Sequence, residues 1–565
     1  MSIEAEAARG RLIRGDLLPY VVGGLTIFIL VAFLLYPILK TVLASFVVSG
    51  KPVAWQNLTT ENFTRFFEAG TYQDAFLNSA TVGLLVTAVS VALALPAAYA
   101  VSRVAMPFRN LILALSVIPL IAPPFIGAYS WVILLGHRGI VTYYLVEWFG
   151  LQVPSIYGLF GIVLALSFHY FPYVLLFVQG ALTAGDPAIE ESAQVMGASR
   201  TRVLRTITFP LVIPTISAGA LIVLVKTLGN FGVPAILGGE YYVLPTLIYY
   251  QVNGYFNLNG ASAIALVNVA ITIVAIWILT LINKKQKFIT VTSLARRAKL
   301  QTTLGIRVLA NVYVWTLLVF ALLPQALVVF MSFAEVWGGT LLPTVYGFGN
   351  YKRLMGDLGV PIMNSLLLAG LATLMCIVFG TVAAYTASRR GFFAKWSLDL
   401  TIMLPFVLPG IVTGVAYLTT FNTGILVLTG TGTIIVLAYF IRRIAYIFRS
   451  VTASVGQLDS GIEEASRMCG AGWAQTMRKI TIPLIAPGIV AGGILVFSTL
   501  ITEISVTILL YSASWKTIAI AIFEQLTNED IFGAGTIGSF AILLTLVLVF
   551  AASKIAGKSM AELFR

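Results

Sequence analysis

The sequence predicts an all-α polytopic membrane protein of about twelve transmembrane helices, arranged as two parallel six-helix repeats. Three observations carry this prediction: the composition, a series of long apolar runs, and a polar segment that occurs twice. Of the 565 residues, 59% are hydrophobic and 10% are charged, and the mean hydropathy is +0.95. Because soluble domains carry about 25% charged residues, this composition excludes an ordinary soluble fold.

Apolar runs are long enough to cross roughly 30 Å of hydrocarbon at twelve places. Six of them precede residue 290, and six follow it. The first six are residues 20–46, 80–99, 111–135, 159–178, 211–228 and 263–282. The second six are residues 308–333, 366–385, 400–418, 434–451, 484–500 and 537–555. The first run follows a basic, polar N-terminus and is too long for a cleaved signal peptide, so we expect a transmembrane helix there.

The distribution of Lys and Arg predicts the orientation of these spans. With the N-terminus inside, most basic residues fall in cytoplasmic loops, and few fall outside. The external ones are Lys51, Arg65, Arg138, Lys352, Arg353 and Lys516. Both termini are therefore expected to be cytoplasmic. The formal charge of +13 is spread between apolar runs, which favours contact with a lipid bilayer and no nucleic-acid partner.

A polar segment of similar sequence interrupts the apolar runs twice. Residues 190–197 read EESAQVMG, and residues 463–470, 273 positions later, read EEASRMCG. Asp186 and Asp459 are placed to cap a short helix, and Pro187 suits its first position. A glycine then ends or bends that helix, and Pro210 or Pro483 begins the next span. One copy alone could be a solvated amphipathic loop, but two copies in register favour a shared function.

These segments resemble the EAA loop of ATP-binding-cassette (ABC) importer permeases. In that loop Glu-Ala-Ala, three further residues, a glycine, nine more residues and Ile-x-Leu-Pro form a coupling helix that docks on a cytoplasmic ATPase. The departures are Glu-Ser-Ala in the first copy, Glu-Ala-Ser in the second, and Phe209 and Ile482 in place of leucine. The resemblance implies a type I ABC importer permease fold. It assigns ATPase coupling to Glu190, Glu191, Ala193, Gly197, Glu463, Glu464, Ala465 and Gly470.

The repeat extends beyond these loops. Residues 78–79 and 97–103 match residues 364–365 and 383–389, now 286 positions apart, and Pro119 and Pro123 match Pro405 and Pro409. The first half therefore carries about thirteen extra residues, which we place in the external segment 137–154. Six spans separate equivalent points, so the repeats are parallel. We expect a first half at residues 1–290 with its coupling loop at 186–210, a linker at 284–307, and a second half at 291–565 with its coupling loop at 459–483.

The chain has no sequence signature of an enzyme. Gly557-Lys558-Ser559 lacks the earlier glycine and the strand that a phosphate-binding loop needs, since residue 552 is alanine. ATP and Mg are expected on a partner ATPase dimer, and this chain is expected to bind no cofactor. Cys376 and Cys469 support neither a disulfide framework nor a thiolate metal site.

Ionisable residues inside the spans are costly and are therefore candidates for the translocation pathway. The paired positions His169 and Arg442, and Asn230 and Glu503, are each 273 apart, which suggests one location at the seam between the halves. The candidates are His169, Lys226, Asn230, Arg442, Arg443 and Glu503. Counting 1.5 Å per residue from Pro483 places Glu503 near the outer mouth and the arginines deeper. A purely structural ion pair, or a Glu503 in external water, is the alternative interpretation.

The outer segment contains five tyrosines that could supply hard oxygen ligands to ferric iron. They are Tyr241, Tyr242, Tyr249, Tyr250 and Tyr255. An interfacial aromatic belt explains the same residues more simply and is preferred, so no metal site is assigned.

The expected function is that of a fused permease subunit of a binding-protein-dependent ABC importer in the bacterial inner (cytoplasmic) membrane. Residues 229–234, GNFGVP, and the tandem architecture resemble ferric-iron importer permeases, which implies a periplasmic or extracytoplasmic binding protein and an ATPase dimer. Import of aminoethylphosphonate, a sugar phosphate or thiamine remains the alternative. An ATP-independent secondary transporter or a channel would have no use for two matched coupling helices.

Overall fold

The computed structural model describes residues 17–556 apart from residues 138, 152–153, 186, 285–302, 338–341, 358, 390–398, 400 and 406. Helices dominate the described residues, and a two-stranded antiparallel ribbon pairs Ala334 with Tyr346. Several sequence predictions lie outside the described residues: the Asp186 cap, most of the 284–307 linker with the 290/291 boundary, and Gly557-Lys558-Ser559.

The first half contains helices of very different length. In chain order they are α2 (Leu17–Leu30), π-helix η1 (Val31–Leu35), α3 (Tyr36–Ser45), 3-10 helix η2 (Trp55–Asn57), α4 (Glu61–Glu68), α5 (Gly70–Arg103), α6 (Arg109–Ile121), α7 (Pro124–Leu135), α8 (Ile140–Phe149), α9 (Leu159–Ala184), α10 (Pro187–Val195), α11 (Arg200–Val203), π-helix η3 (Leu204–Thr208), α12 (Phe209–Leu228), α13 (Gly232–Leu237), α14 (Leu244–Asn253) and α15 (Leu258–Lys284).

The second half repeats most of this order. It contains α16 (Leu304–Ser332), β1 (Ala334–Val336), β2 (Val345–Tyr346), α17 (Gly349–Asp357), α18 (Gly359–Arg389), α20 (Gly410–Phe421), α21 (Gly432–Gly456), α22 (Ser460–Met468), α23 (Trp473–Thr476), π-helix η4 (Met477–Thr481), α24 (Ile482–Ile501), α25 (Thr507–Leu510), 3-10 helix η5 (Ala513–Trp515), α26 (Ile518–Thr527) and α27 (Ile531–Ala556).

Nine helices of the described chain, each of 23–34 residues, are long and apolar enough to cross a membrane. A tenth span results if α6 and the helical segment 124–149, which meet at a bend of 95°, are counted together. Two of the twelve predicted runs remain. One is α21, which is 25 residues long but carries Arg442, Arg443 and Arg449. The other, 400–418, is described only in part and ends in the short helix α20.

The bends have a local cause. Pro123 and Pro409, which are equivalent in the two halves, directly precede α7 and α20, and both adopt extended backbone angles. Proline lacks a backbone N–H and disfavours helical angles at the residue before it. A continuous helix therefore cannot run through this point, and the span bends there. The repeat thus preserves a broken element in each half.

The first helix of each half packs on the other half. The Tyr417 hydroxyl donates a hydrogen bond to the Phe33 carbonyl (2.8 Å), so η1 is tied to α20. In the reciprocal contact, the Ser130 hydroxyl of α7 donates to the Pro324 carbonyl of α16 (2.9 Å). Both hydrophobic cores contain residues of both halves: one joins second-half helices with first-half residues such as Leu30, Leu34 and Phe231, and the other joins first-half helices with residues of α16 such as Val314 and Leu318.

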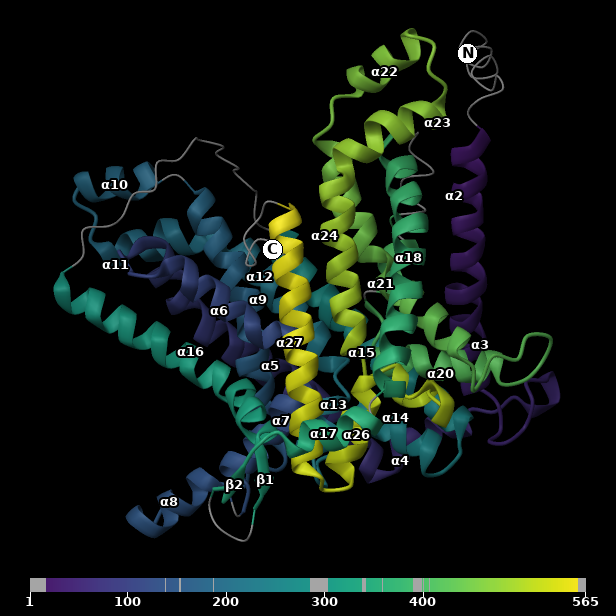
Figure 1. The fold of residues 1–565 in the computed structure, drawn as a ribbon, viewed down its shortest axis with the longest axis horizontal. Helices are drawn as coiled ribbons and strands as arrows, with labels where there is room; N and C mark the ends of the chain where they lie inside the picture. The colour runs from purple at the N-terminus through teal and green to yellow at the C-terminus, as the bar shows by residue number, and fades with distance from the viewer. Residues whose placement is uncertain are drawn as a thin grey trace.

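Both polar segments lie toward the same end of the molecule. In Figure 1, α10 and α11 and also α22 and α23 lie toward the end at which α2 begins, while α4, α8, α17 and the β-ribbon lie at the opposite end. The predicted thirteen-residue insertion contains α8, which projects from α7 at that opposite end. This arrangement agrees with parallel repeats, since inverted repeats would place the segments at opposite ends.

Candidate functional site

The two polar segments fold into helices with matching boundaries. Asp459 caps α22, because its Oδ1 accepts a hydrogen bond from the Gly461 N–H (2.9 Å), and α10 begins at Pro187 as the sequence predicts. Gly197 and Gly470 have φ of +87° and +83°, which explains why both copies carry glycine. We call α10 with α11, and α22 with α23, the coupling helices.

A buried glutamate attaches the first coupling helix to the transmembrane bundle. Glu190 Oε1 accepts a hydrogen bond from Arg103 Nη2 (2.9 Å), and both side chains are at least 93% buried. Arg103 is the last residue of α5, so this ion pair joins the coupling helix to the end of a long transmembrane helix. Breaking such a buried pair by removing one partner costs about 3–5 kcal/mol.

The second coupling helix is attached at the equivalent position. Glu463 lies 3.5 Å from Arg389 Nε at the end of α18. Its carboxylate also accepts hydrogen bonds from the Thr481 hydroxyl (2.9 Å) and the Tyr385 hydroxyl (3.2 Å). Arg103 and Arg389 match in the sequence repeat, so the same anchor is built twice.

The remaining predicted coupling residues divide by burial. Ala193 is buried with Glu190, whereas the others are exposed: Glu191, Gly197, Glu464, Ala465 and Gly470. Beside them, Val195, Met196 and Met468 are 82–88% exposed although they are apolar. Each coupling helix therefore presents an acidic and apolar surface that this chain leaves uncovered. The sequence did not reveal which glutamate of each pair is buried.

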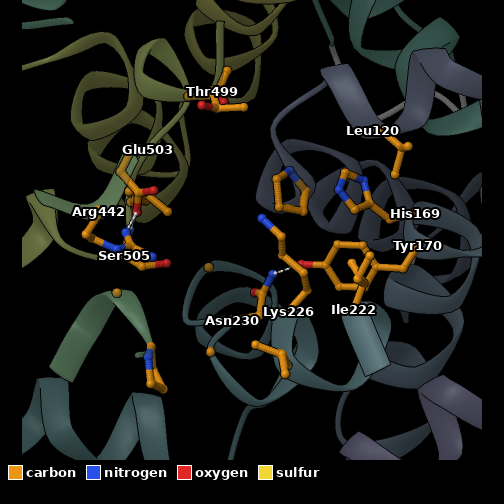
Figure 2. Close-up of a pocket in the computed structure, with 18 of the residues that line it drawn as sticks. Leu120, His169, Tyr170, Ile222, Lys226, Asn230, Arg442, Thr499, Glu503 and Ser505 are labelled. Atoms are coloured by element: carbon orange, nitrogen blue, oxygen red, sulfur yellow. Dashed lines mark hydrogen bonds and ion pairs between the residues drawn. The ribbon is translucent and has the colours of Figure 1, made fainter. Parts of the chain in front are cut away.

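A cavity of about 160 Å³ lies at the seam between the two halves. All six candidate pathway residues line it: His169, Lys226, Asn230, Arg442, Arg443 and Glu503. Figure 2 shows His169, Tyr170, Lys226 and Asn230 of the first half facing Arg442, Thr499, Glu503 and Ser505 of the second. The volume is many times what a single water needs, so the cavity has room for a small ligand.

Glu503 is the centre of a charged cluster on the second-half side. Its Oε1 lies 2.8 Å from Arg442 Nη1, and its Oε2 accepts a hydrogen bond from Arg443 Nη2 (2.6 Å). The Ser505 N–H also donates to Oε1 (3.0 Å). The Arg443 guanidinium lies 5.6 Å from the centre of the Tyr446 ring, which adds a cation–π contact.

The placement of Glu503 corrects one sequence prediction. Glu503 is 7% exposed and contacts both arginines, so it lies at their depth and neither near the outer mouth nor in external water. The helix count failed because α24 ends at Ile501 inside the molecule, and the chain then folds into buried residues 503–510 instead of continuing outward.

The first half builds the same arrangement from neutral groups. Asn230 Nδ2 donates a hydrogen bond to the Tyr170 hydroxyl (3.0 Å), and Asn230 Oδ1 accepts one from the Val233 N–H (3.0 Å). Asn230 and Glu503 are equivalent, and so are Tyr170 and Arg443, since each pair is 273 positions apart. Tyr170 was not predicted as a site residue, although this spacing could have identified it.

The charges of the cavity do not balance. Among its described lining residues, Lys226, Arg442 and Arg443 carry positive charge and Glu503 carries negative charge, while Lys226 hydrogen-bonds to the neutral side chain of Tyr446. On the membrane-insertion scale, each lysine or arginine at the centre of a helix costs about 2.5–3.5 kcal/mol. Two excess positive charges are therefore expensive, which points to a function for them.

Glycines lie at close contacts of the seam. A Cβ on Gly410 would lie 2.7 Å from Arg442 Nη1, so glycine makes room for the guanidinium at the break before α20. A Cβ on Gly229 would lie 3.4 Å from Pro409 Cα of the other half. Phe231, in the predicted 229–234 segment, is fully buried and packs on Tyr249 and Phe523, whose ring centres lie 5.0 and 5.9 Å away.

The outer tyrosines pack on one another. Tyr242 and Tyr249 both contact the Tyr250 ring, at 5.6 and 5.7 Å between centres. Burial raises the pKa of the Tyr241, Tyr249 and Tyr250 hydroxyls, which makes the phenolate form that binds ferric iron harder to reach. Within the described chain, no three His, Cys, Asp or Glu side chains gather as a metal site.

Comparison with known proteins gives consistent matches. A family described as "Binding-protein-dependent transport system inner membrane component" matches residues 90–288 and 376–562, once in each half. The chain is 27% identical to the "Ferric transport system permease protein FbpB" of Actinobacillus pleuropneumoniae, with 96% of this chain and 79% of that protein covered.

Other proteins match most of the chain or less than half of it. The chain is 29% identical to the "Putative ferric transport system permease protein FbpB 1" of Haemophilus influenzae, with 90% of this chain and 80% of that protein covered. The chain is also 26% identical to the "Putative 2-aminoethylphosphonate transport system permease protein PhnV" of Salmonella paratyphi A, with 42% of this chain and 90% of that protein covered. A crystal structure of a bacterial alginate ABC transporter in complex with an alginate pentasaccharide-bound periplasmic protein is 23% identical, covers 49% of this chain and 97% of that chain, and has a TM-score of 0.40.

Proposed function

Because this chain belongs to the family of binding-protein-dependent transport system inner membrane components, we propose that it is the fused permease of a ferric-iron importer driven by a separate ATPase. The family match in each half accounts for the tandem architecture. Substrate passes along the seam between the halves, and the central cavity is one point on that path. Alternating access of the seam to the two sides of the membrane moves the substrate.

The observation that carries this proposal is the pair of matched coupling helices at one end of the molecule. Each is joined to a transmembrane helix by an ion pair: Glu190 with the buried Arg103, and Glu463 with the partly buried Arg389. A force applied to the exposed face of either helix is thus transmitted to α5 or α18. Two equivalent docking surfaces suit a dimeric ATPase, on which the ATP and Mg chemistry is expected.

Partners and orientation follow from the same placement. The ATPase binds the coupling helices in the cytoplasm, so the start of α2 is cytoplasmic as well, and the C-terminus is expected on the same side. The opposite end, with α4, α8 and α17, faces a periplasmic or extracytoplasmic substrate-binding protein. The chain itself is embedded in the bacterial inner membrane.

The choice of ferric iron is supported by similarity along nearly the whole chain. Two relatives named as ferric transport permeases cover 96% and 90% of this chain. Import of an organophosphonate is the second candidate, because the cavity carries excess positive charge and a phosphonate permease matches one half. Secondary transport without ATP leaves the two coupling helices unexplained.

The test is uptake by proteoliposomes that contain this chain together with the ATPase and the substrate-binding protein encoded beside it. We expect uptake of radioactive ferric iron that requires ATP and both partners. Uptake of 2-aminoethylphosphonate in place of iron would support the second candidate. Uptake that persists without the ATPase and follows an ion gradient would refute the importer proposal.

A further inference from the structure

We infer that the central cavity binds an oxyanion group, of the phosphate, phosphonate or carboxylate kind, which crosses the membrane either as the substrate or as the anionic ligand of ferric iron. The inference deepens the proposed function and rests on it. It concerns the chemical form in which the substrate passes the seam between the halves.

The first argument is that the carboxylate of the cavity is already occupied. Both oxygens of Glu503 are engaged, Oε1 by Arg442 and a backbone N–H, and Oε2 by Arg443. A bare ferric ion in this cavity would meet three cationic side chains and no free carboxylate among the described lining residues. Repulsion by like charges therefore disfavours a bare metal cation.

The second argument is that donors remain after these pairs have formed. Arg442 Nε and Arg443 Nε are buried and have no hydrogen-bond acceptor among the described residues. The Arg443 side chain as a whole is 90% buried. Lys226 extends into the space between the two groups of side chains (Figure 2). Guanidinium and ammonium groups on two sides of a cavity are suited to oxygen atoms that carry negative charge.

The third argument is that the fold does not require these charges. The equivalent of the Arg443–Glu503 ion pair is the neutral Tyr170–Asn230 hydrogen bond. Likewise, His169 stands where the other half has Arg442, and Thr499 stands where it has Lys226. Since neutral groups make the same helix contacts in the repeat, the positive charges serve the content of the cavity better than its packing.

The binding experiment uses the full chain in lipid nanodiscs, with radioactive inorganic phosphate as the probe and methylphosphonate or acetate as competitors. We expect saturable phosphate binding that the competitors displace. Lys226→Met and Arg442→Gln should each raise the Kd tenfold or more, on the order expected for loss of one charge-assisted hydrogen bond. Arg449→Gln is the matched control, because Arg449 lies on the same helix, is 58% exposed and pairs with Asp399 outside the cavity.

A variant that should raise the affinity for phosphate distinguishes a binding role from simple misfolding, because misfolding can only lower the affinity. Glu503→Gln removes the negative charge and releases both arginines, so phosphate should bind more tightly to it than to the wild type. A packing role for the cluster predicts no gain in affinity. Absence of phosphate binding to the wild type, or equal Kd values for Lys226→Met and Arg449→Gln, would overturn the inference.

Transport separates this inference from the proposed function. In the reconstituted importer, radioactive iron and radioactive phosphate or citrate are supplied together. Entry of the anion with iron, or of a phosphonate without iron, supports the inference and identifies the source of the oxyanion. Entry of iron alone, at an undiminished rate in Lys226→Met, contradicts the inference and leaves the importer intact. Absence of any ATP-dependent uptake by the wild type would instead refute the proposed function.

Discussion

The two neighbouring glutamates of the second coupling helix provide the sharpest test of how this helix is held. Glu463 is buried and has three partners, Arg389, Tyr385 and Thr481, whereas Glu464 is exposed. Glu463→Ala removes an ion pair with the partly buried Arg389 and two hydrogen bonds, and the loss of a buried group with these partners costs about 3 kcal/mol. Glu464→Ala changes only an exposed side chain, for which the usual effect is within about 0.5 kcal/mol.

Because the coupling helix is short and lies at the end of the bundle, we expect this loss as local opening of α22 and not as global unfolding. At about 1.4 kcal/mol for each factor of ten, 3 kcal/mol corresponds to a rise of roughly two orders of magnitude in the exchange rate of the α22 amides. Hydrogen exchange measured by mass spectrometry on peptides that cover Ser460–Met468 gives this rate directly.

The control and the refuting result come from the same measurement. Glu464→Ala should leave α22 exchange unchanged and should reduce co-purification of the ATPase, because its carboxylate faces the partner. Equal exchange in the Glu463→Ala and Glu464→Ala variants would show that burial of Glu463 does not anchor the helix. The assignment of separate structural and docking roles would then be wrong.

Two further predictions concern the same helices. Gly197→Leu and Gly470→Leu should each destabilise the coupling helix by about 1–2 kcal/mol, because φ is positive at both sites, and should lower ATP-dependent uptake. Gly472→Leu is the control, because Gly472 has a φ of −71° and open space around it; this variant should transport normally. Cys469 is exposed, and Met196 occupies the equivalent position in the first half. We expect native Cys469 and a Met196→Cys variant to react with an impermeant maleimide from the same side of sealed vesicles. Reaction from opposite sides would contradict the parallel arrangement.

Several features could be predicted because their causes are local in the chain. Long apolar runs predicted the spans, and the six spans between equivalent points of the repeat predicted parallel halves. The requirement for glycine at positions 197 and 470 follows from their positive φ, and the Asp459 cap depends on a residue only two positions away. The repeat spacing also brought His169, Asn230, Arg442 and Glu503 to one candidate site, and all four line the same cavity.

The sequence did not predict features that depend on contacts between residues far apart in the chain. Neighbouring residues on a helix point about 100° apart, so the sequence EE does not show which glutamate turns toward the bundle. Arg103 lies 87 residues before Glu190, and only the packing of α9 beside α5 brings them together. The depth of Glu503 likewise depends on where α24 ends inside the molecule.

The sequence by itself therefore determined the class of protein, the duplication and the positions of the coupling loops, since hydropathy and spacing are properties of the chain. Tertiary structure alone decided that the first helix of each half packs on the other half, that Glu190 and Glu463 are buried anchors, and that one carboxylate meets two arginines in a cavity with excess positive charge. The physical reason is that burial and charge pairing depend on groups from several helices, and their distances are set only when the helices pack.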